Sequence, residues 1–362
     1  MRMNDIAALD KNMAVMNRID DPTVEWRSAR TMPFRLEGLY DAYAAGPYRR
    51  MNAQVAAEVS EGVSQLALCT AGGRVRFETN SPYVAIHAEM KDICRMDHMA
   101  FCGIFGFDMY IKREGTWIYR GTFRPPVDLA GGYESKLTLP GGMCEIMINF
   151  PLYNGVDELR IGLSKGSRLI GPSEYKRKGR IVYYGSSITQ GGCASRPGNS
   201  YQAIIGRALD TDYLNLGFSG NALGERAMAE YIADIKQMSA FVCDYDHNAP
   251  TPEHLKATHR PLYEIVRAKN PTLPIIFITK PNIDERIQDA DVIAEDRARR
   301  AIVRETYDYA CAQGDKHVAF IDGATMFDGF MRDSCTVDGC HPNDLGFMRM
   351  AEVIKRELRK LH

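Results

Sequence analysis

The sequence predicts two domains of different fold classes, an antiparallel β-sandwich followed by an α/β domain whose parallel sheet is flanked by helices. Between residues 31 and 170, apolar and polar side chains alternate in short segments, which is typical of half-buried strands. Between residues 178 and 362, short apolar runs alternate with segments of helical periodicity, which indicates a covered parallel sheet. Residues 1–30 precede both patterns and are expected to form a helical or irregular segment.

The strands predicted in the first domain are short and end at turn signals. Residues 74–78 alternate polar and apolar side chains, and residues 144–150 place their apolar side chains on one face. Residues 108–120 are predicted to form a hairpin, because a Glu-Gly turn divides two alternating segments. Many short strands with regular turns favour a sandwich, and the glycine-containing turns lie at residues 71–73, 114–115, 130–132 and 140–142.

The second domain is predicted to alternate strands and helices along the chain. The predicted strands are residues 180–187, 212–217, 240–245, 274–279 and 317–322. The predicted helices are residues 201–209, 225–238, 253–269, 292–311 and 343–361. A segment rich in Gly, Lys, Arg and Ser, residues 164–180, is predicted to link the two domains.

Composition argues against several classes of function. The formal net charge is −1, which is not that of a protein binding nucleic acid or an anionic membrane through its overall charge. The sequence shows no secretory leader and no apolar run of the length that a membrane span needs. Nine cysteines without a CxxC pair are expected to be free thiols in a reducing compartment, so we expect a cytoplasmic protein.

Polar residues with catalytic chemistry follow several of the predicted strands. The carboxyl ends of parallel strands meet at one edge of the sheet, where ligands bind in open α/β domains. The residues placed there, or just before the last helix, are Gly185–Ser187, Gly217–Asn221, Asp244–Asn248 and Asp338–Pro342. They supply a serine, glycine backbone amides, an asparagine amide and an Asp-His pair, which together suit nucleophilic catalysis with an oxyanion hole.

The spacing of the Asp-His pair has a physical reason. Asp338 precedes His341 by three residues, in a turn that leads into a predicted helix. A carboxylate in that position can reach the imidazole Nδ1, which leaves Nε2 free to take a proton from a serine. Pro342 is expected in the first turn of the helix, so that His341 stands at a rigid helix entry.

Four segments resemble the sequence blocks of the SGNH (GDSL-type) hydrolases, in the order in which that family carries them. They are GSSIT, NLGFSGN, DYDHNA and DGCHPNDLGF. The resemblance implies that Ser187 is the nucleophile, His341 the general base and Asp338 its orienting carboxylate. It also implies an oxyanion hole formed by Ser187, Gly220 and Asn248. The third block lacks the usual Gly-x-Asn-Asp, so Asn248 is assigned by its position after the strand.

The first domain carries a second resemblance. FGFDMY, with Asp108 and Tyr110, is similar to the Gly-x-Asp-Leu-Tyr signature of a β-domain that precedes an SGNH domain in bacterial esterases. The combination also resembles two-domain carbohydrate deacetylases, in which a jelly-roll precedes the hydrolase. Asp108 and Tyr110 are either strand and turn residues of the sandwich or part of a wall of the substrate site. Asp246 and His247 are further candidates for that wall.

These resemblances predict a serine esterase that removes short acyl groups, above all acetyl, from a carbohydrate or similar small ester. No metal or organic cofactor is expected, and the expected partner is a small-molecule or oligosaccharide ester, with homo-oligomerisation as a general expectation. A thioesterase, a lysophospholipase, an acyl transferase and a catalytically inactive carbohydrate-binding protein stay open as alternatives. His247, His254 and His259 suggest a metal cluster, but a solvated helix face is favoured because no further ligand completes the set.

Overall fold

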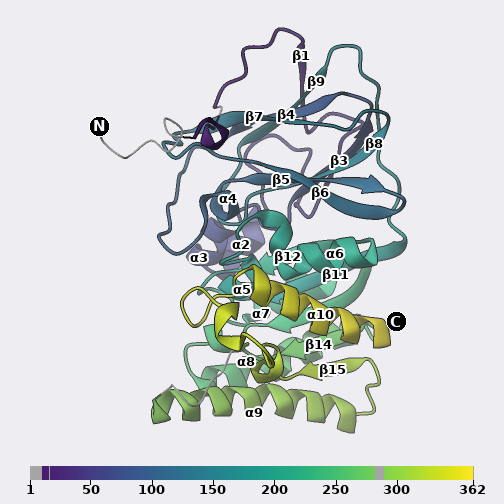
Figure 1. Ribbon diagram of the computed structural model, residues 1–362. Helices are drawn as coiled ribbons and strands as arrows, with labels where there is room; N and C mark the ends of the chain where they lie inside the picture. Colours follow the sequence, from purple (N-terminus) through teal and green to yellow (C-terminus); the bar gives the residue numbers. More distant parts are fainter. Residues whose placement is uncertain (1–9, 16, 282–288, 362) are drawn as a thin grey trace.

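The computed structural model describes residues 10–15, 17–281 and 289–361, and it confirms the predicted combination of fold classes. Figure 1 shows the antiparallel sheets at the top and the α/β domain below them, with α9 (Ala290–Ala312) farthest from the sandwich. Within the described residues, no helix has the length and apolar character needed to cross a membrane.

The first domain consists of two antiparallel sheets. One has the strand order β1 (Val24–Ser28), β9 (Glu158–Ser164), β4 (Tyr83–Glu89), β7 (Gly132–Thr138). The other has the order β10 (Leu169–Ile170), β3 (Arg74–Thr79), β8 (Cys144–Asn149), β5 (Phe107–Arg113), β6 (Thr116–Phe123), and β2 (Arg35–Glu37) pairs with β3. The predicted hairpin is confirmed as β5 and β6. The expectation for residues 1–30 was wrong at β1, which pairs along its whole length with β9.

The second domain has a five-stranded parallel sheet of the predicted type. Its strand order is β12 (Thr211–Gly217), β11 (Arg177–Gly185), β13 (Met238–Asp244), β14 (Ile275–Ile278), β15 (Val318–Ile321). The helices that accompany it are α6 (Tyr201–Leu209), α7 (Arg226–Asp234), α8 (Pro252–Lys269), α9 and α10 (Asp344–Lys360). The chain order reverses at β11, between β12 and β13, so the carboxyl end of β11 lies where open α/β sheets bind their ligands.

Two adjacent helices in the first half of the chain are among the elements that were not predicted. They are α2 (Ala53–Val59) and α3 (Glu61–Leu66), which begin after the capping residues Asn52 and Ser60. Met51 and Val63 belong to the same hydrophobic cluster as the strands of the parallel sheet. By its packing, this segment is therefore part of the α/β domain.

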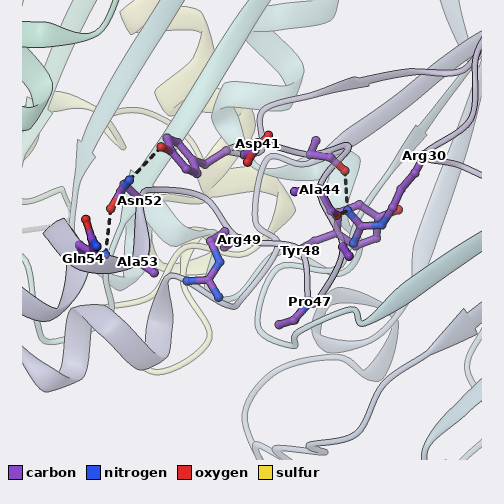
Figure 2. A pocket seen from close by; sticks show the side chains of 12 residues that line it. Arg30, Asp41, Ala44, Pro47, Tyr48, Arg49, Asn52, Ala53 and Gln54 are labelled. Carbon is purple, nitrogen blue, oxygen red and sulfur yellow. Dashed lines mark hydrogen bonds between the residues drawn. The ribbon is translucent and has the colours of Figure 1, made fainter.

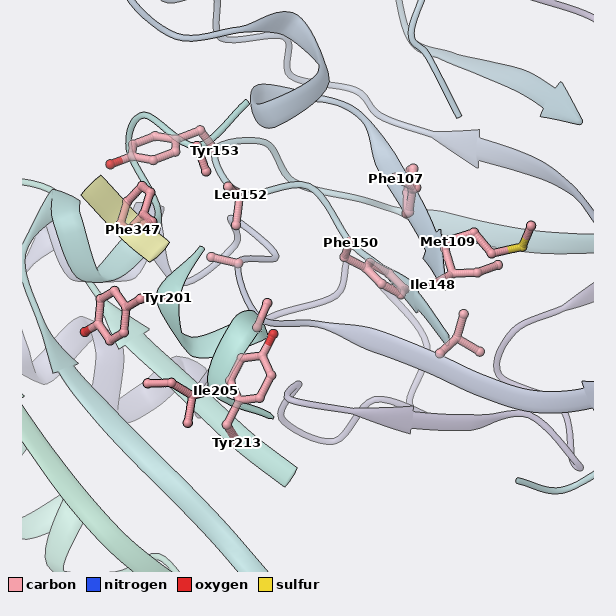
Figure 3. Packing of buried hydrophobic residues seen from close by; sticks show 14 of the residues in the cluster. Phe107, Met109, Ile148, Phe150, Leu152, Tyr153, Tyr201, Ile205, Tyr213 and Phe347 are labelled. Atoms are coloured by element: carbon pink, nitrogen blue, oxygen red, sulfur yellow. The ribbon is translucent and has the colours of Figure 1, made fainter. Parts of the chain in front are cut away.

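The two domains share a hydrophobic core. Buried side chains of the sandwich, such as Phe107 and Phe150, form one cluster with Tyr201 of α6 and Phe347 of α10 (Figure 3). Leu152 lies between the two groups in this view and is also buried. Because removing apolar surface from water is the main driving force of folding, this shared core fixes the two domains relative to each other.

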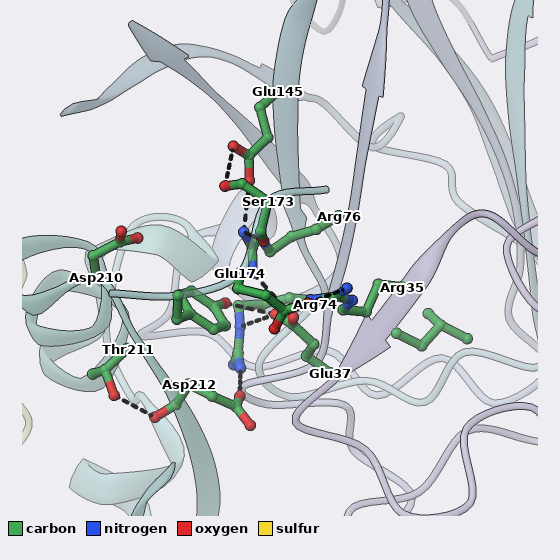
Figure 4. Close-up of polar contacts among 12 residues, drawn as sticks. Arg35, Glu37, Arg74, Arg76, Glu145, Ser173, Glu174, Asp210, Thr211 and Asp212 are labelled. Carbon is green, nitrogen blue, oxygen red and sulfur yellow. Dashed lines mark hydrogen bonds and ion pairs between the residues drawn. The ribbon is translucent and has the colours of Figure 1, made fainter. Parts of the chain in front are cut away.

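A buried ionic network adds a polar contact between the domains (Figure 4). Arg74 of β3 contacts the Asp212 carboxylate of β12, and Arg76 of β3 lies 3.1 Å from Glu37 and 2.6 Å from Glu145. Both guanidinium groups are buried, and buried charges are tolerated in folded proteins when they are paired in this way. The network lies at the start of β12, at the opposite end of this strand from its carboxyl-end loop.

The interpretation of three histidines as a solvated helix face was wrong for one of them. His259 is buried, and its Nδ1 lies 2.8 Å from the hydroxyl of Thr306. His254 Nε2 lies 2.8 Å from the carbonyl oxygen of Leu223, and His247 lies in the loop after β13. Helical spacing alone did not reveal that α9 covers this part of α8.

We expect His259 to make the free energy of unfolding fall as the pH drops from about 6.5 to about 4. Burial lowers the pKa of His259 to about 4, and nearby Asp246 only partly opposes this. The unfolded chain therefore binds a proton that the folded protein does not, which costs about 1.4 kcal/mol for each pH unit in this window. His259→Phe keeps an aromatic ring against Tyr245 and Phe277 but has no group that titrates in this range. This part of the pH dependence of stability should therefore be absent in the variant.

The comparison is made by urea unfolding of both proteins at pH 7 and pH 5. The wild-type protein should lose about 1–2 kcal/mol more than His259→Phe between these pH values. Equal losses would show that His259 accepts a proton as readily in the folded protein as in the unfolded chain.

Candidate active site

The nucleophile candidate stands where β11 ends and a short helix begins. Ser187 is the first residue of α5 (Ser187–Gln190), and the Ser186 side chain caps this helix by accepting a hydrogen bond from the Ile188 amide. Only glycine fits at the end of β11, because a Cβ on Gly185 would lie 2.1 Å from the carbonyl oxygen of Asp244. This close approach lets the strand turn sharply and places Ser187 at the rim of the sheet, where it is 9% exposed.

Ser187, His341 and Asp338 form a continuous hydrogen-bonded chain. Ser187 Oγ lies 2.9 Å from His341 Nε2, and His341 Nδ1 lies 2.7 Å from Asp338 Oδ2. Asp338 Oδ1 also accepts hydrogen bonds from the amides of His341 and Cys340, at 2.7 and 3.0 Å. Burial alone would raise the pKa of Asp338, but these hydrogen bonds lower it to about 2. The carboxylate is therefore ionised at neutral pH.

The loop that carries the Asp-His pair is held where it enters α10. Asn343 caps α10 by accepting hydrogen bonds from the amides of Leu345 and Gly346, so Pro342 lies just before the helix and not, as predicted, in its first turn. The Pro342 carbonyl accepts a hydrogen bond of 2.8 Å from the Cys193 amide, in the loop after the nucleophile helix. The serine and the histidine are thus joined through backbone as well as through side chains.

The residues expected to form an oxyanion hole follow the neighbouring strands β11, β12 and β13. Ser187 is in the first turn of α5, where backbone amides have no partner within the helix. Gly220 has a φ of +66° and follows β12, with open space where a Cβ would be. Asn248 Nδ2 donates a hydrogen bond of 3.1 Å to the Phe218 carbonyl, which joins the loop after β13 to the loop after β12. A primary amide has two N–H groups, so this contact uses only one of them.

Several residues that hold this site were missed by the sequence analysis. Gln190 is buried, and its Oε1 accepts a hydrogen bond of 3.0 Å from the Ser219 amide. Tyr153 of the first domain donates its hydroxyl to the Ser187 carbonyl at 3.0 Å. Gln190 lies three residues after the serine on one short helix, which is a local signal that could have been used. Tyr153 has no such signal, because its contact depends on how the domains meet.

Of the two interpretations of Asp108 and Tyr110, strand and turn residues of the sandwich or part of a substrate-site wall, their burial favours the first. Both side chains are buried, with 0% and 3% of their surface exposed, so neither faces an open site. Arg196, in the segment after α5, places one guanidinium nitrogen 2.6 Å from Asp108 Oδ2 and 2.6 Å from the Tyr110 hydroxyl. Asp108 also accepts hydrogen bonds from Gly198 and Asn149. The signature residues of the β-domain therefore fasten it to the α/β domain.

Asp246 also contributes no accessible wall. Its carboxylate is buried, accepts a hydrogen bond from the Lys280 amide at 3.0 Å and lies 3.1 Å from His247 Nδ1. Among the described residues, oxygen or nitrogen atoms of Asp244, Asp246 and His247 lie within 4.8 Å of one another, as do those of His98, Asp338 and His341. In the part of the chain that the structure describes, His247, His254 and His259 do not form such a group, which agrees with the choice not to interpret them as a metal cluster.

A pocket of about 400 Å³ lies elsewhere in the first domain (Figure 2). Arg30 lines it, and its guanidinium is bound to the carbonyl oxygens of Ala42 and Gly46, both at 2.6 Å. None of the three residues of the hydrogen-bonded chain is among those lining this pocket.

With this geometry in place, residues 178–359 match the model of the GDSL-like lipase/acylhydrolase family. The chain belongs to this family. Residues 24–169 match the N-terminal domain that accompanies esterases of the SGNH-hydrolase type, so the predicted resemblance is confirmed in both halves. The protein is accordingly a carboxylic ester hydrolase of this family. No curated protein gives a significant match.

Solved structures with the same arrangement include three of interest. A protein from Bacteroides ovatus assigned as a GDSL-like lipase is 29% identical, with a TM-score of 0.84 over 93% of this chain and 98% of its own. A salicylyl-acyltransferase from a tetracycline biosynthetic pathway is 21% identical, with a TM-score of 0.75 over 94% and 98%. An acetyl xylan esterase from the rumen bacterium Butyrivibrio proteoclasticus is 14% identical, with a TM-score of 0.57 over 93% and 98%. The last two likenesses are likenesses of fold.

Proposed function

We propose that this family member is a serine esterase that hydrolyses short-chain acyl esters, with an acetylated carbohydrate as substrate. The observation that carries the proposal is the unbroken chain from Ser187 through His341 to Asp338, with contacts of 2.9 and 2.7 Å. A serine hydroxyl is a weak nucleophile alone, and an oriented imidazole is what activates it.

In the first step, Ser187 Oγ attacks the acyl carbonyl while His341 Nε2 takes its proton. The ionised Asp338 holds the imidazole in the tautomer with hydrogen on Nδ1 and stabilises the charged ring that forms. The negative charge on the carbonyl oxygen is bound by the Ser187 and Gly220 amides and the Asn248 side chain. Each donor of this kind contributes about 3 kcal/mol to transition-state stabilisation.

In the second step, His341 returns the proton to the leaving oxygen, and the alcohol departs. Water then attacks the acyl-enzyme with His341 as general base, which releases the acid and regenerates Ser187. A second alcohol in place of water would give an acyl transferase, and a protein of similar fold is a salicylyl-acyltransferase.

A carbohydrate acetate is the first substrate to examine. The two-domain arrangement is shared in fold with an acetyl xylan esterase and with family two carbohydrate esterases. The partner of this chain would then be an oligosaccharide or a smaller sugar ester.

The proposal is tested by measuring hydrolysis of p-nitrophenyl acetate, butyrate and octanoate. We expect kcat/KM to be highest for acetate and to fall with chain length. Equal or rising values with chain length would refute the short-acyl part and favour a lysophospholipase-type enzyme. Turnover only when an acceptor alcohol is added would favour an acyl transferase, and no turnover of any ester would refute the esterase.

A further inference from the structure

A histidine of the first domain lies against the histidine of the candidate site. The rings of His98 and His341 have centroids 5.5 Å apart and meet edge to face at 64°. One ring nitrogen of each lies within 4.8 Å of the other and of an Asp338 carboxylate oxygen. The His98 side chain is 33% exposed, so it is both beside the site and open to solvent.

The loop that carries His98 is held in place although it has no regular structure. The Cys94 amide donates a hydrogen bond of 3.3 Å to Asn154 Oδ1, and Met99 is buried directly after His98. The short helix α4 (Phe101–Ile104) follows, and a Cβ on Gly103 would lie 2.2 Å from the carbonyl oxygen of Ala194. Glycine therefore lets α4 contact the loop after the nucleophile, which brings His98 to the rim.

The reaction determines which half of the ester lies on the side of the site where His98 stands. Two of the three proposed oxyanion donors, Gly220 and Asn248, lie on the loops after β12 and β13, whereas His341 lies on the loop before α10. The leaving oxygen must come within hydrogen-bond distance of His341 Nε2 to be protonated. The alcohol half of the ester consequently passes over His341 and next to His98, and the acyl half lies toward the oxyanion donors.

We propose that His98 binds the alcohol half of the substrate and selects alcohols that carry further hydroxyl groups, such as sugars. This inference rests on the proposed esterase function. An imidazole can donate or accept a hydrogen bond with a hydroxyl group, and its ring face can pack against the C–H groups of a pyranose. The first domain would thereby contribute directly to substrate choice, in addition to fastening the α/β domain.

The test compares two acetates with alcohol halves of similar size, 6-O-acetylglucose and cyclohexylmethyl acetate, which lacks hydroxyl groups. In His98→Ala, we expect KM for 6-O-acetylglucose to rise about fivefold with kcat nearly unchanged, since one hydrogen bond contributes about 1 kcal/mol. For cyclohexylmethyl acetate, kcat/KM should change less than about twofold. His98→Gln, which keeps a hydrogen-bonding group, should recover part of the lost affinity.

His87→Ala is the matched control. His87 lies in the same domain with 32% of its side chain exposed, but it contacts Glu134 in the first sheet instead of the site. His87→Ala should leave KM and kcat unchanged for both acetates. An equal loss for both acetates in His98→Ala, or no loss for either, would overturn the role of His98. If the wild-type protein hydrolysed neither of these acetates nor p-nitrophenyl acetate, the proposed esterase function itself would be refuted.

Discussion

Ser187→Ala is expected to lower kcat for p-nitrophenyl acetate by roughly 10⁴- to 10⁶-fold while leaving the protein folded. The alanine removes the only atom that would form the acyl-enzyme, and it leaves His341 and Asp338 hydrogen-bonded to each other. The small Oγ is all that is lost at a position already in a helix, so little change in stability is expected. Steady-state kinetics and thermal unfolding of both proteins measure the two effects.

Ser186→Ala provides the control, because the chain has two adjacent serines with different contacts. The Ser186 hydroxyl caps α5 through the Ile188 amide at 3.2 Å, whereas Ser187 Oγ faces His341. Losing the cap should cost about 1 kcal/mol of stability and change kcat by less than about tenfold. If Ser186→Ala lost activity and Ser187→Ala kept it, the nucleophile would be Ser186 and the assignment to Ser187 would be wrong.

The strands and helices of the α/β domain were predictable because their signals are local. Each carries its own hydrophobic periodicity, so α6 was predicted with its observed bounds and β12 to within a residue. The helices α2 and α3 were missed because they are short and because their apolar side chains face a sheet that is formed much later in the chain. The parallel sheet, not the helices' own periodicity, gives them a surface to pack on.

The candidate site shows the same division. Ser187 and His341 could be placed from sequence because each lies in a motif at a strand or helix end, and the sheet brings such ends together. The roles of Asp108 and Tyr110 could not, since their partner Arg196 is far away in the chain and is met only when the domains pack. A signature motif indicated that these residues matter and gave no information about which direction they face.

Arg50 also makes contacts with segments far away in the chain that its sequence context did not predict. It is fully buried and donates hydrogen bonds to the carbonyls of Leu66 and Cys69 at 2.7 Å and to that of Gly217 at 2.6 Å. A further bond of 3.1 Å reaches the carbonyl of Asn215. Burial lowers the pKa of Arg50 to about 10, so the guanidinium stays charged at neutral pH and its contacts are strong.

Arg50 connects the first half of the chain to the loop after β12, which carries the proposed oxyanion donor Gly220. Gly217 ends β12 and begins the segment that carries Gly220. It also packs directly against the nucleophile helix, because a Cβ on Gly217 would lie 2.2 Å from the Gln190 amide nitrogen. A shift of the Gly217 carbonyl would therefore be transmitted both to α5 and to the proposed oxyanion donors.

Arg50→Met is accordingly expected to lower the free energy of unfolding by about 3–4 kcal/mol, because it removes the hydrogen bonds that a buried guanidinium donates to four backbone carbonyls. The kcat of the protein that remains folded should fall roughly ten- to a hundredfold, since small displacements of catalytic groups are costly. Arg50→Lys keeps the positive charge but has fewer N–H donors. Its stability and its kcat should therefore lie between those of the wild-type protein and those of Arg50→Met.

The neighbouring Arg49→Met is the matched control, because the Arg49 side chain makes none of these contacts and its residue is only partly buried. Urea unfolding and ester hydrolysis of the four proteins, measured below the unfolding midpoint of the weakest, separate stability from rate. If Arg50→Met lost stability with kcat unchanged, the arginine would only brace the core. A parallel loss of kcat in Arg50→Met and a partial one in Arg50→Lys would show that a buried side chain from the first half of the chain sets the geometry of the loop that carries Gly220.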